Sequence, residues 1–331
     1  MNRVLVIGGG GFVGSAIVRQ LLDRGIECRV LGRNTYPHLV AQGVRCLCAD
    51  IRDPAGLARH FQGVDTVFHV AALAGIWGRW QDYNEINVQG TNNVLSACRS
   101  QGVRSLVYTS SPSVVFDRHD ICGGDETLPY PHRFLCHYAR SKALAERVVL
   151  QTSNDQLLTC AIRPHLVWGP GDPHLIPRLM ERGQARQLVR IGSGRNRVDI
   201  SYIDNVAHAH LLAADNLAGS ATAAGRSYFI SQDEPVKLWD WIAHLFERLD
   251  LPPVTRSLPF SLAYLMGAVL EWYATCRNLH DEPRMTRFLA MQLARSHWFS
   301  TARACEDLGY HPLISIDEGM NRLIESIRTG T

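Results

Sequence analysis

The sequence predicts an α/β fold, in which a doubly wound parallel sheet is followed by a smaller, mostly helical lobe. Three observations lead to this prediction. Short apolar runs alternate with longer amphipathic stretches over the first 165 residues, a glycine run directly follows the first apolar run, and the alternation becomes irregular beyond residue 165. Alternating β and α units pair their strands in parallel and place helices on both faces of the sheet.

The individual elements follow from length and hydrophobic periodicity. The expected strands of the first part are 3–7, 27–31, 44–49, 64–70, 104–110 and 157–163, and the expected helices are 12–24, 54–62, 82–101 and 138–152. In the second part we expect short strands near 198–202 and 226–230, and helices near 173–183, 204–216, 236–250, 259–275, 284–294, 300–308 and 316–328.

These patterns divide the chain into a first domain, residues 1–165, and a helical lobe, residues 166–331, from which some strands return to the main sheet. Ligands of such sheets bind outside the carboxyl ends of the strands. We therefore expect the helical lobe to cover a substrate site at that edge.

Composition excludes several classes of function. The net charge of +3, without a basic run, does not indicate a nucleic-acid partner. The nine cysteines form no CxxC pair, so we predict no metal site. The chain opens directly into a strand, and its longest apolar stretch, Leu258 to Leu270, is too short to span a bilayer. We expect a cytoplasmic protein without a transmembrane segment.

Four consecutive glycines stand between the first strand and the first helix, in "VLVIGGGGFVG" at residues 4–14. A strand, a glycine-rich loop and a helix N-terminus together bind the pyrophosphate of a dinucleotide, because the loop allows close backbone approach and the helix offers free N–H groups. The alternative is a bare turn. The residues expected to bind the cofactor here are Gly8, Gly11, Phe12, Val13 and Gly14.

The ends of the next two strands indicate which dinucleotide binds. An NAD site usually has a carboxylate at the end of the second strand, but this chain has Gly32 followed by Arg33 and Asn34. An arginine at this position can pair with a 2′-phosphate, which favours NADP(H). The alternative is that Arg33 is a solvated turn residue. Asp50 and Ile51, after the third strand, are expected either to flank the adenine or, for Asp50, to cap the next helix.

Tyr138 and Lys142 lie four residues apart on a predicted helix, so their side chains project from the same face. A neighbouring ammonium and the positive ring of an oxidised nicotinamide would lower the pKa of a tyrosine, which then can exchange a proton with substrate. Lys142 is one of only two lysines in the chain. Upstream, the expected strand 104–110 ends in the hydroxyl residues Thr109 and Ser110, and Ser113 follows it. Hydroxyls at this edge either hold a substrate carbonyl or satisfy loop backbone groups.

These features and several further motifs occur in the order typical of the extended short-chain dehydrogenase/reductases, a family of Rossmann-type enzymes that the chain resembles over nearly its whole length. The further motifs are "HVAA" at 69–72, "NVQGTNNV" at 87–94, "YTSS" at 108–111, "RPHLVWGPGD" at 163–172 and "YIDNVAHAH" at 202–210.

The resemblance implies a role for each matching residue. Ser111 would orient the substrate carbonyl, Tyr138 would be the general acid/base and Lys142 its activator. Asn87 corresponds to the asparagine of the family's proton relay. The resemblance places the remaining expected cofactor contacts at Ala71, Ala72, Pro164 and His165.

Two segments, "AALAGIWGRW" at 71–80 and "ACEDLGYHPLISIDEGM" at 304–320, are similar to the 3β-hydroxysteroid dehydrogenase/isomerase branch of the family. Within it, the chain resembles bacterial olefin-biosynthesis reductases of 2-alkyl-3-oxoalkanoic acids. This implies an NADPH-dependent reductase of long-chain β-keto acids. The alternatives are a 3β-hydroxysteroid or sterol-4α-carboxylate 3-dehydrogenase and, from another class, a non-catalytic dinucleotide sensor, which the intact Tyr138 and Lys142 pair disfavours.

The resemblance also implies a homodimer, formed through helices 82–101 and 138–152. It further suggests an assembly of this protein with other enzymes of the olefin pathway. The stretch "LPFSLAYLMGAVLEWYA", residues 258–274, has apolar residues at helical spacing. We interpret it first as a core helix of the C-terminal lobe. The alternative is an apolar face, including Leu262 and Met266, that lines the mouth of the substrate pocket or rests on a membrane or a partner enzyme.

Overall fold

A computed structural model describes residues 1–232 and 234–330 of the chain. Its central element is a seven-stranded sheet in which all neighbouring strands are parallel. The strands lie in the order β12 (Ser227–Ile230), β7 (Leu158–Pro164), β5 (Ser105–Thr109), β4 (Thr66–His69), β1 (Val4–Ile7), β2 (Cys28–Gly32) and β3 (Arg45–Cys48). The expected fold class is confirmed.

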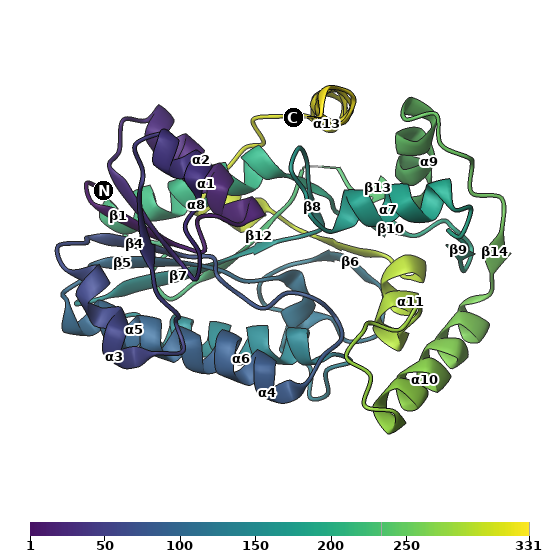
Figure 1. The fold of residues 1–331 in the computed structure, drawn as a ribbon, viewed down its shortest axis with the longest axis horizontal. Helices are drawn as coiled ribbons and strands as arrows, with labels where there is room; N and C mark the ends of the chain where they lie inside the picture. Colours follow the sequence, from purple (N-terminus) through teal and green to yellow (C-terminus); the bar gives the residue numbers. More distant parts are fainter. Residues whose placement is uncertain (233, 331) are drawn as a thin grey trace.

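Helices cover both faces of this sheet (Figure 1). One face carries α1 (Phe12–Asp23) and α8 (Ile203–Ala218), which pack against each other. The other carries α5 (Gly90–Ser100) and α6 (His137–Thr152). Because helices cover both faces, strands β1, β4 and β5 are buried along their whole length. This explains their nearly continuous apolar runs.

The strand order reverses between β1 and β4. These strands are neighbours in the sheet, although β2 and β3 follow β1 in the chain. Ile7, at the end of β1, pairs with His69, at the end of β4. The glycine loop leaves β1 here, and the loop from residue 70 to residue 79 leaves β4. This is the topological switch point, where ligands of doubly wound sheets bind.

The remaining helices are α2 (Pro37–Ala41), α3 (Pro54–Leu57), α4 (Trp80–Tyr83), α7 (Leu175–Gln184), α9 (Leu238–Arg248), α10 (Phe260–Cys276), α11 (Arg287–Ala294), α12 (Ala302–Leu308) and α13 (Ile316–Thr329). A four-stranded sheet joins β13 (Val236–Lys237), β10 (Arg197–Val198), β15 (His297–Phe299) and β6 (Ile121–Gly124). Two short pairs join β11 (Ser201–Tyr202) with β8 (Val167–Trp168) and β14 (Ser257–Leu258) with β9 (Arg190–Ile191).

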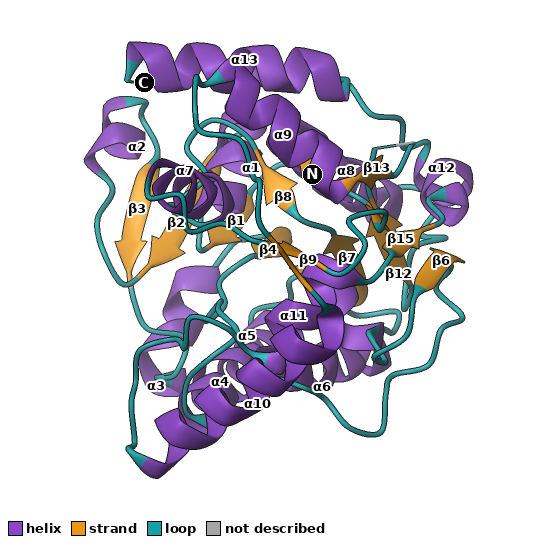
Figure 2. Cartoon of the chain, turned by 90° about the vertical axis from the view of Figure 1, so that its right-hand side faces the viewer, coloured by secondary structure: helices purple, strands orange, loops and turns teal. Residues whose placement is uncertain are grey.

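Helices α10 and α11 pack together on the side of the molecule that faces the viewer in Figure 2, in front of α4 and α6. Helix α13 lies at the top of this view, whereas α10 lies in its lower half. The expected helix at 82–101 is interrupted: α4 passes into a π-helix, Asn84–Gln89, before α5. The expected helix at 54–62 becomes α3 and a 3₁₀-helix, Ala58–Phe61. A further 3₁₀-helix, Pro112–Val115, follows β5.

Candidate active site

A cavity of about 560 Å³ opens at the switch point. At one side it is lined by Arg33 and Asp50, which follow β2 and β3, and at the other by Tyr138 and Lys142 of α6. The residues at its lining that the sequence predicted are Gly8, Gly11, Phe12, Val13, Arg33, Asp50, Ile51, Ala71, Ala72, Ser111, Tyr138, Lys142 and Pro164. The topology therefore brings most of the expected site into one cavity.

The glycine run is required both by this cavity and by packing. Gly8 has φ +83°, and a Cβ on it would lie 2.8 Å from the backbone nitrogen of Ala71. A Cβ on Gly10 would lie 2.0 Å from a ring carbon of Tyr36, so the tyrosine ring packs directly on the loop. The sequence alone explains the whole glycine run by a pyrophosphate, whereas in the structure Gly10 is required by its contact with Tyr36.

Helix α1 begins at the cavity, and no side chain caps its first turn. Its N-cap is Gly11, which supplies no side-chain acceptor, and none of its first-turn residues is acidic. Free N–H groups and the positive end of the helix dipole then face the cavity. This arrangement fits the pyrophosphate of a dinucleotide. Gly14 lies within α1 against the carbonyl oxygen of Gly8 and does not line the cavity.

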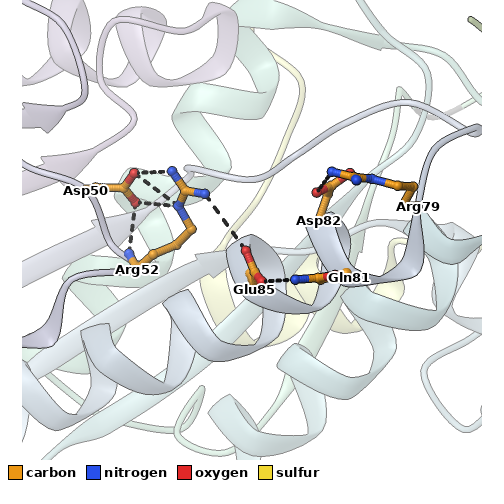
Figure 3. Close-up of polar contacts among 6 residues, drawn as sticks. All are labelled: Asp50, Arg52, Arg79, Gln81, Asp82 and Glu85. Carbon is orange, nitrogen blue, oxygen red and sulfur yellow. Dashed lines mark hydrogen bonds and ion pairs between the residues drawn. The ribbon is translucent and has the colours of Figure 1, made fainter. Parts of the chain in front are cut away.

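Arg33 is exposed at the rim of the cavity, while Asn34 lies outside it. Asp50 accepts hydrogen bonds from the guanidinium and the backbone N–H of Arg52, with the shortest at 2.7 Å (Figure 3). These bonds lower the pKa of Asp50, and Arg33 adds to the effect. The helix-capping alternative for Asp50 is wrong, because Asp53 caps the following helix α3.

Tyr138 and Ser111 meet at the other side of the cavity. Burial raises the pKa of Tyr138 to about 12, while a hydrogen bond from Ser111 lowers it. Ser111 Oγ accepts hydrogen bonds from the backbone N–H of Ser113 at 3.2 Å and from the Ser113 hydroxyl at 3.0 Å. Because Ser111 Oγ accepts both of these bonds, Ser113 does not use the Ser111 hydrogen, which can be donated to Tyr138 or to a substrate oxygen in the cavity. The expected lowering of the Tyr138 pKa does not occur in the chain alone, where burial is the largest influence.

Lys142 is almost completely buried, with 2% of its surface exposed. Its Nζ donates to the carbonyl oxygen of Thr109 and lies 4.1 Å from the ring centre of Tyr108. Burial lowers the pKa of Lys142 to about 7, and the carboxylate of Glu146 opposes that shift. The ammonium is thus fixed at the carboxyl end of β5, the strand that leads directly to Ser111.

Glu146 lies one turn beyond Lys142 and is also buried. It forms a bidentate ion pair with Arg163 of β7, with N–O distances of 2.7 and 2.9 Å, and accepts a hydrogen bond from Tyr130 at 2.6 Å. Burial raises the pKa of Glu146, but the ion pair with Arg163 and the hydrogen bonds lower it by more, so the pKa lies below its usual value. A carboxylate paired in this way stays ionised and keeps a negative charge near Lys142.

Asn87 lies in the π-helix and is buried outside the cavity lining. Its Oδ1 accepts from the backbone N–H of Leu73 at 2.7 Å, and its Nδ2 donates to the Leu73 carbonyl at 3.0 Å and to Ser141 Oγ at 2.9 Å. The side chain ties the loop after β4 to α6. An irregular turn of this kind often occurs at functional sites.

His165 is buried behind the cavity rather than at its lining. Its Nδ1 lies 2.7 Å from the carbonyl oxygen of Asp199, and its Nε2 lies 3.1 Å from Nδ1 of His297. Pro164, the preceding residue, does line the cavity. Sequence reasoning missed Tyr36, Arg52, Ile86 and the segment 173–175, all of which line the cavity. Their positions depend on tertiary contacts, and no local motif marks them.

An apolar cluster leads away from Tyr138 toward a second cavity. The ring of Tyr138 packs against a cluster that includes Phe116, Ala139 and Met291. Five further members, Ile76, Phe134, Leu135, Cys136 and Phe288, also line a cavity of about 1000 Å³ between α6 and α10. The loop after β4 lines both cavities, with residues 70–74 at the first and 76–79 at the second.

Comparison with known proteins identifies the family. The model of the 3-beta hydroxysteroid dehydrogenase/isomerase family matches residues 5–260. The chain belongs to this family. It is an oxidoreductase of the extended short-chain dehydrogenase/reductase type, and its family is NAD(P)-dependent.

Relatives in this family match the chain over almost its whole length. A protein of Stenotrophomonas maltophilia named 2-alkyl-3-oxoalkanoate reductase is 44% identical, with 97% of this chain and 98% of the relative covered. A protein of the same name from Shewanella oneidensis is also 44% identical, with 99% of this chain and 87% of the relative covered. A decarboxylating sterol-4-alpha-carboxylate 3-dehydrogenase of Mus musculus is 33% identical, with 98% of this chain and 91% of the relative covered.

Solved structures agree with the fold. The crystal structure of gox2253 superposes with a TM-score of 0.82 at 28% identity, over 100% of this chain and 99% of that one. The structure of MoeE5 in complex with UDP-glucose and NAD has a TM-score of 0.76 at 24% identity, over 99% of both chains. The second likeness shows the fold alone.

Proposed function

We propose that this enzyme reduces 2-alkyl-3-oxoalkanoic acids to the corresponding 3-hydroxy acids with NADPH, as a step in long-chain olefin biosynthesis. The observation that carries the proposal is the apolar cluster from Tyr138 to the second cavity, lined by Ile76, Phe134 and Phe288. A substrate with long alkyl branches beside its carbonyl needs such a space next to the proton donor. The two 44% identical relatives with this name support the same substrate class.

The cofactor would bind in the first cavity, with the glycine loop and α1 at its pyrophosphate. Arg33 would hold the 2′-phosphate of NADPH, and Lys142 and Pro164 would contact the nicotinamide end. When bound, the reduced nicotinamide supplies the hydride. The absence of a carboxylate at the end of β2 and the exposure of Arg33 at the rim support NADPH over NADH.

In this proposal the chain's own residues orient the carbonyl and supply the proton. Ser111 donates a hydrogen bond to the substrate oxygen, using the hydrogen left free by its contacts with Ser113. Tyr138 donates its phenolic proton to that oxygen as the alcohol forms, and Lys142 stabilises the resulting phenolate. The raised pKa of Tyr138 keeps it protonated at neutral pH, as reduction requires. Asn87 acts as a positioning residue for the loop after β4.

The experiment is an absorbance assay of NADPH oxidation with a series of 2-alkyl-3-oxo acids of increasing chain length. We expect turnover that depends on NADPH, with a KM that falls as the alkyl chains lengthen. A 3-oxosteroid and a sterol-4α-carboxylate are the comparison substrates, because relatives with these activities are 33–37% identical. Turnover confined to the steroids would contradict the proposed substrate class, but it would leave the proposed roles of the reacting residues unchanged.

A further inference from the structure

Helix α10 packs on the rest of the protein through its small residues. Ala263, Gly267 and Ala274 are buried, and a Cβ on Gly267 would lie 2.6 Å from the backbone of Thr286, just before α11. The remaining buried residue, Glu271, accepts a hydrogen bond from the backbone N–H of Arg287 at 2.6 Å and forms an ion pair with its guanidinium. The close packing by small residues turns the large side chains of this helix outward.

The outward face of α10 is apolar and uncharged. Its large residues, with their exposed fractions, are Leu262 (48%), Leu265 (60%), Met266 (41%), Val269 (55%), Trp272 (67%) and Tyr273 (48%). Glu271 is the one charged residue among the seventeen of the helix, and it points inward. Solvent-exposed helices of globular proteins normally carry charged residues on this side. A continuous exposed apolar patch marks an interaction surface. The expected core helix is therefore wrong for these six residues, whereas Leu258 and Leu270 of the same segment pack against the core.

Positive charge borders this face. The second cavity lies beside α10, and its lining includes Arg118, Arg133 and Arg140. Within residues 1–232 and 234–330, none of these three guanidinium groups forms an ion pair, whereas the other two arginines of the lining pair with Asp82 and Glu271. We call these three arginines the arginine rim. Trp77 and Trp272 line the same cavity.

We propose that the outward face of α10 binds the surface of a bilayer that contains anionic phospholipids. The helix would lie in the plane of the interface, with Leu265, Met266 and Val269 among the upper acyl carbons. Trp272 and Tyr273 suit the headgroup level, because their rings are apolar with one polar atom. The arginine rim would contact lipid phosphates. In the part of the chain that the structure describes, no helix is both long and apolar enough to cross a bilayer.

Charge argues against a second copy of this chain as the occupant. A two-fold contact through this face would bring the arginine rims of both copies to the same interface, where like charges repel. An anionic bilayer supplies the opposite charge and an apolar layer together. If the proposed function holds, docking would also place the second cavity at the membrane, so that long-chain substrates reach Tyr138 without crossing water. The binding itself does not depend on that function.

The experiment is flotation of the full chain with vesicles of phosphatidylcholine alone or of equal parts phosphatidylcholine and phosphatidylglycerol, without substrate. We expect flotation with the anionic vesicles, weakened by salt. The double variant Leu265→Glu with Trp272→Glu should lower the bound fraction at least tenfold. Leu313→Glu is the matched control, because Leu313 is 58% exposed in the segment before α13, and it should float like the wild type.

Two further measurements keep the outcome independent of folding. Trp272→Phe should remove most of the blue shift in tryptophan emission that anionic vesicles induce in the wild type. Arg133→Ala with Arg140→Ala should weaken flotation with the anionic vesicles only. Absence of wild-type flotation with both vesicles would overturn the proposal. So would light scattering in which the α10 double variant turns a dimer into a monomer while vesicle binding is unaffected.

Discussion

Helices α6 and α10 both line the second cavity, and each departs from the usual distribution of polar and apolar side chains. Helix α6 buries the charged residues Lys142 and Glu146, whereas α10 exposes Leu265 and Trp272. Buried charge must be paired and hydrogen-bonded, and the partners Thr109 and Arg163 supply this on α6. Exposed apolar surface needs a partner outside the chain. Departures from the ordinary pattern thus mark two different kinds of functional surface.

The largest expected effect on this comparison comes from Lys142→Met, which removes the buried ammonium of α6. Turnover should fall at least about 100-fold, and NADPH affinity should fall as well, because Lys142 is proposed to hold both the phenolate and the nicotinamide ribose. Lys237→Met is the matched control. Lys237 is the other lysine of the chain, its side chain is 61% exposed, and the variant should keep wild-type kinetics.

The same variant carries a pH signature. Burial lowers the pKa of Lys142 to about 7 from its usual 10.5. Between these two pH values the unfolded chain binds a proton that the folded chain does not bind. Lys142 should therefore make the free energy of unfolding of the wild type rise with pH across this range. Urea denaturation across this range should show that component in the wild type and not in Lys142→Met. Equal pH profiles would mean that Lys142 stays charged in the folded protein.

The buried carboxylates of the two helices should contribute differently to the free energy of unfolding. Glu146→Gln breaks a fully buried pair and leaves Arg163 without a counter-charge, which should lower the free energy of unfolding by about 3 kcal/mol. Glu271→Gln affects a pair whose arginine side chain is 42% exposed, and its cost should be about 1 kcal/mol. Urea denaturation measures both. A similar cost for the two substitutions would contradict the contrast between the helices.

Arg33→Ala tests the adenosine side of the first cavity. We expect NADPH to bind about tenfold more weakly, because one charge-assisted contact to the 2′-phosphate is lost, while NADH affinity stays unchanged. Titration of each cofactor by the quenching of protein fluorescence provides the measurement. A parallel loss for both cofactors would remove Arg33 from the 2′-phosphate site and return it to a solvated turn residue.

The smallest effect is expected on the outward face of α10. Leu265→Gln should change the free energy of unfolding by no more than about 0.5 kcal/mol, because the side chain contacts solvent. Gly267→Ala should cost about 1 kcal/mol or more, since its new methyl group meets the backbone of Thr286. Thermal denaturation of both variants compares the two faces. A large loss with Leu265→Gln would place that residue in the core.

Local patterns predicted the parts of the fold and site that depend on neighbouring residues. The glycine loop after β1 and the pair Tyr138 and Lys142 carry their own spacing, so their place at one cavity follows from strand order. Tyr36 could not be predicted as the partner of Gly10, because the contact arises only when β1 and β2 pair. Periodicity found α10 but could not tell which face is buried, since nearly every residue of this helix is apolar.

The central claim is that α6 carries the reacting residues, with Tyr138 as the proton donor. Tyr138→Phe tests it most directly, because the substitution removes one hydroxyl and keeps the ring that packs in the apolar cluster. NADPH affinity and turnover are measured on the same protein, with whichever substrate the wild type reduces. The account predicts an unchanged NADPH affinity and a loss of turnover of at least about 100-fold at neutral pH. Turnover within a few-fold of the wild type would contradict it.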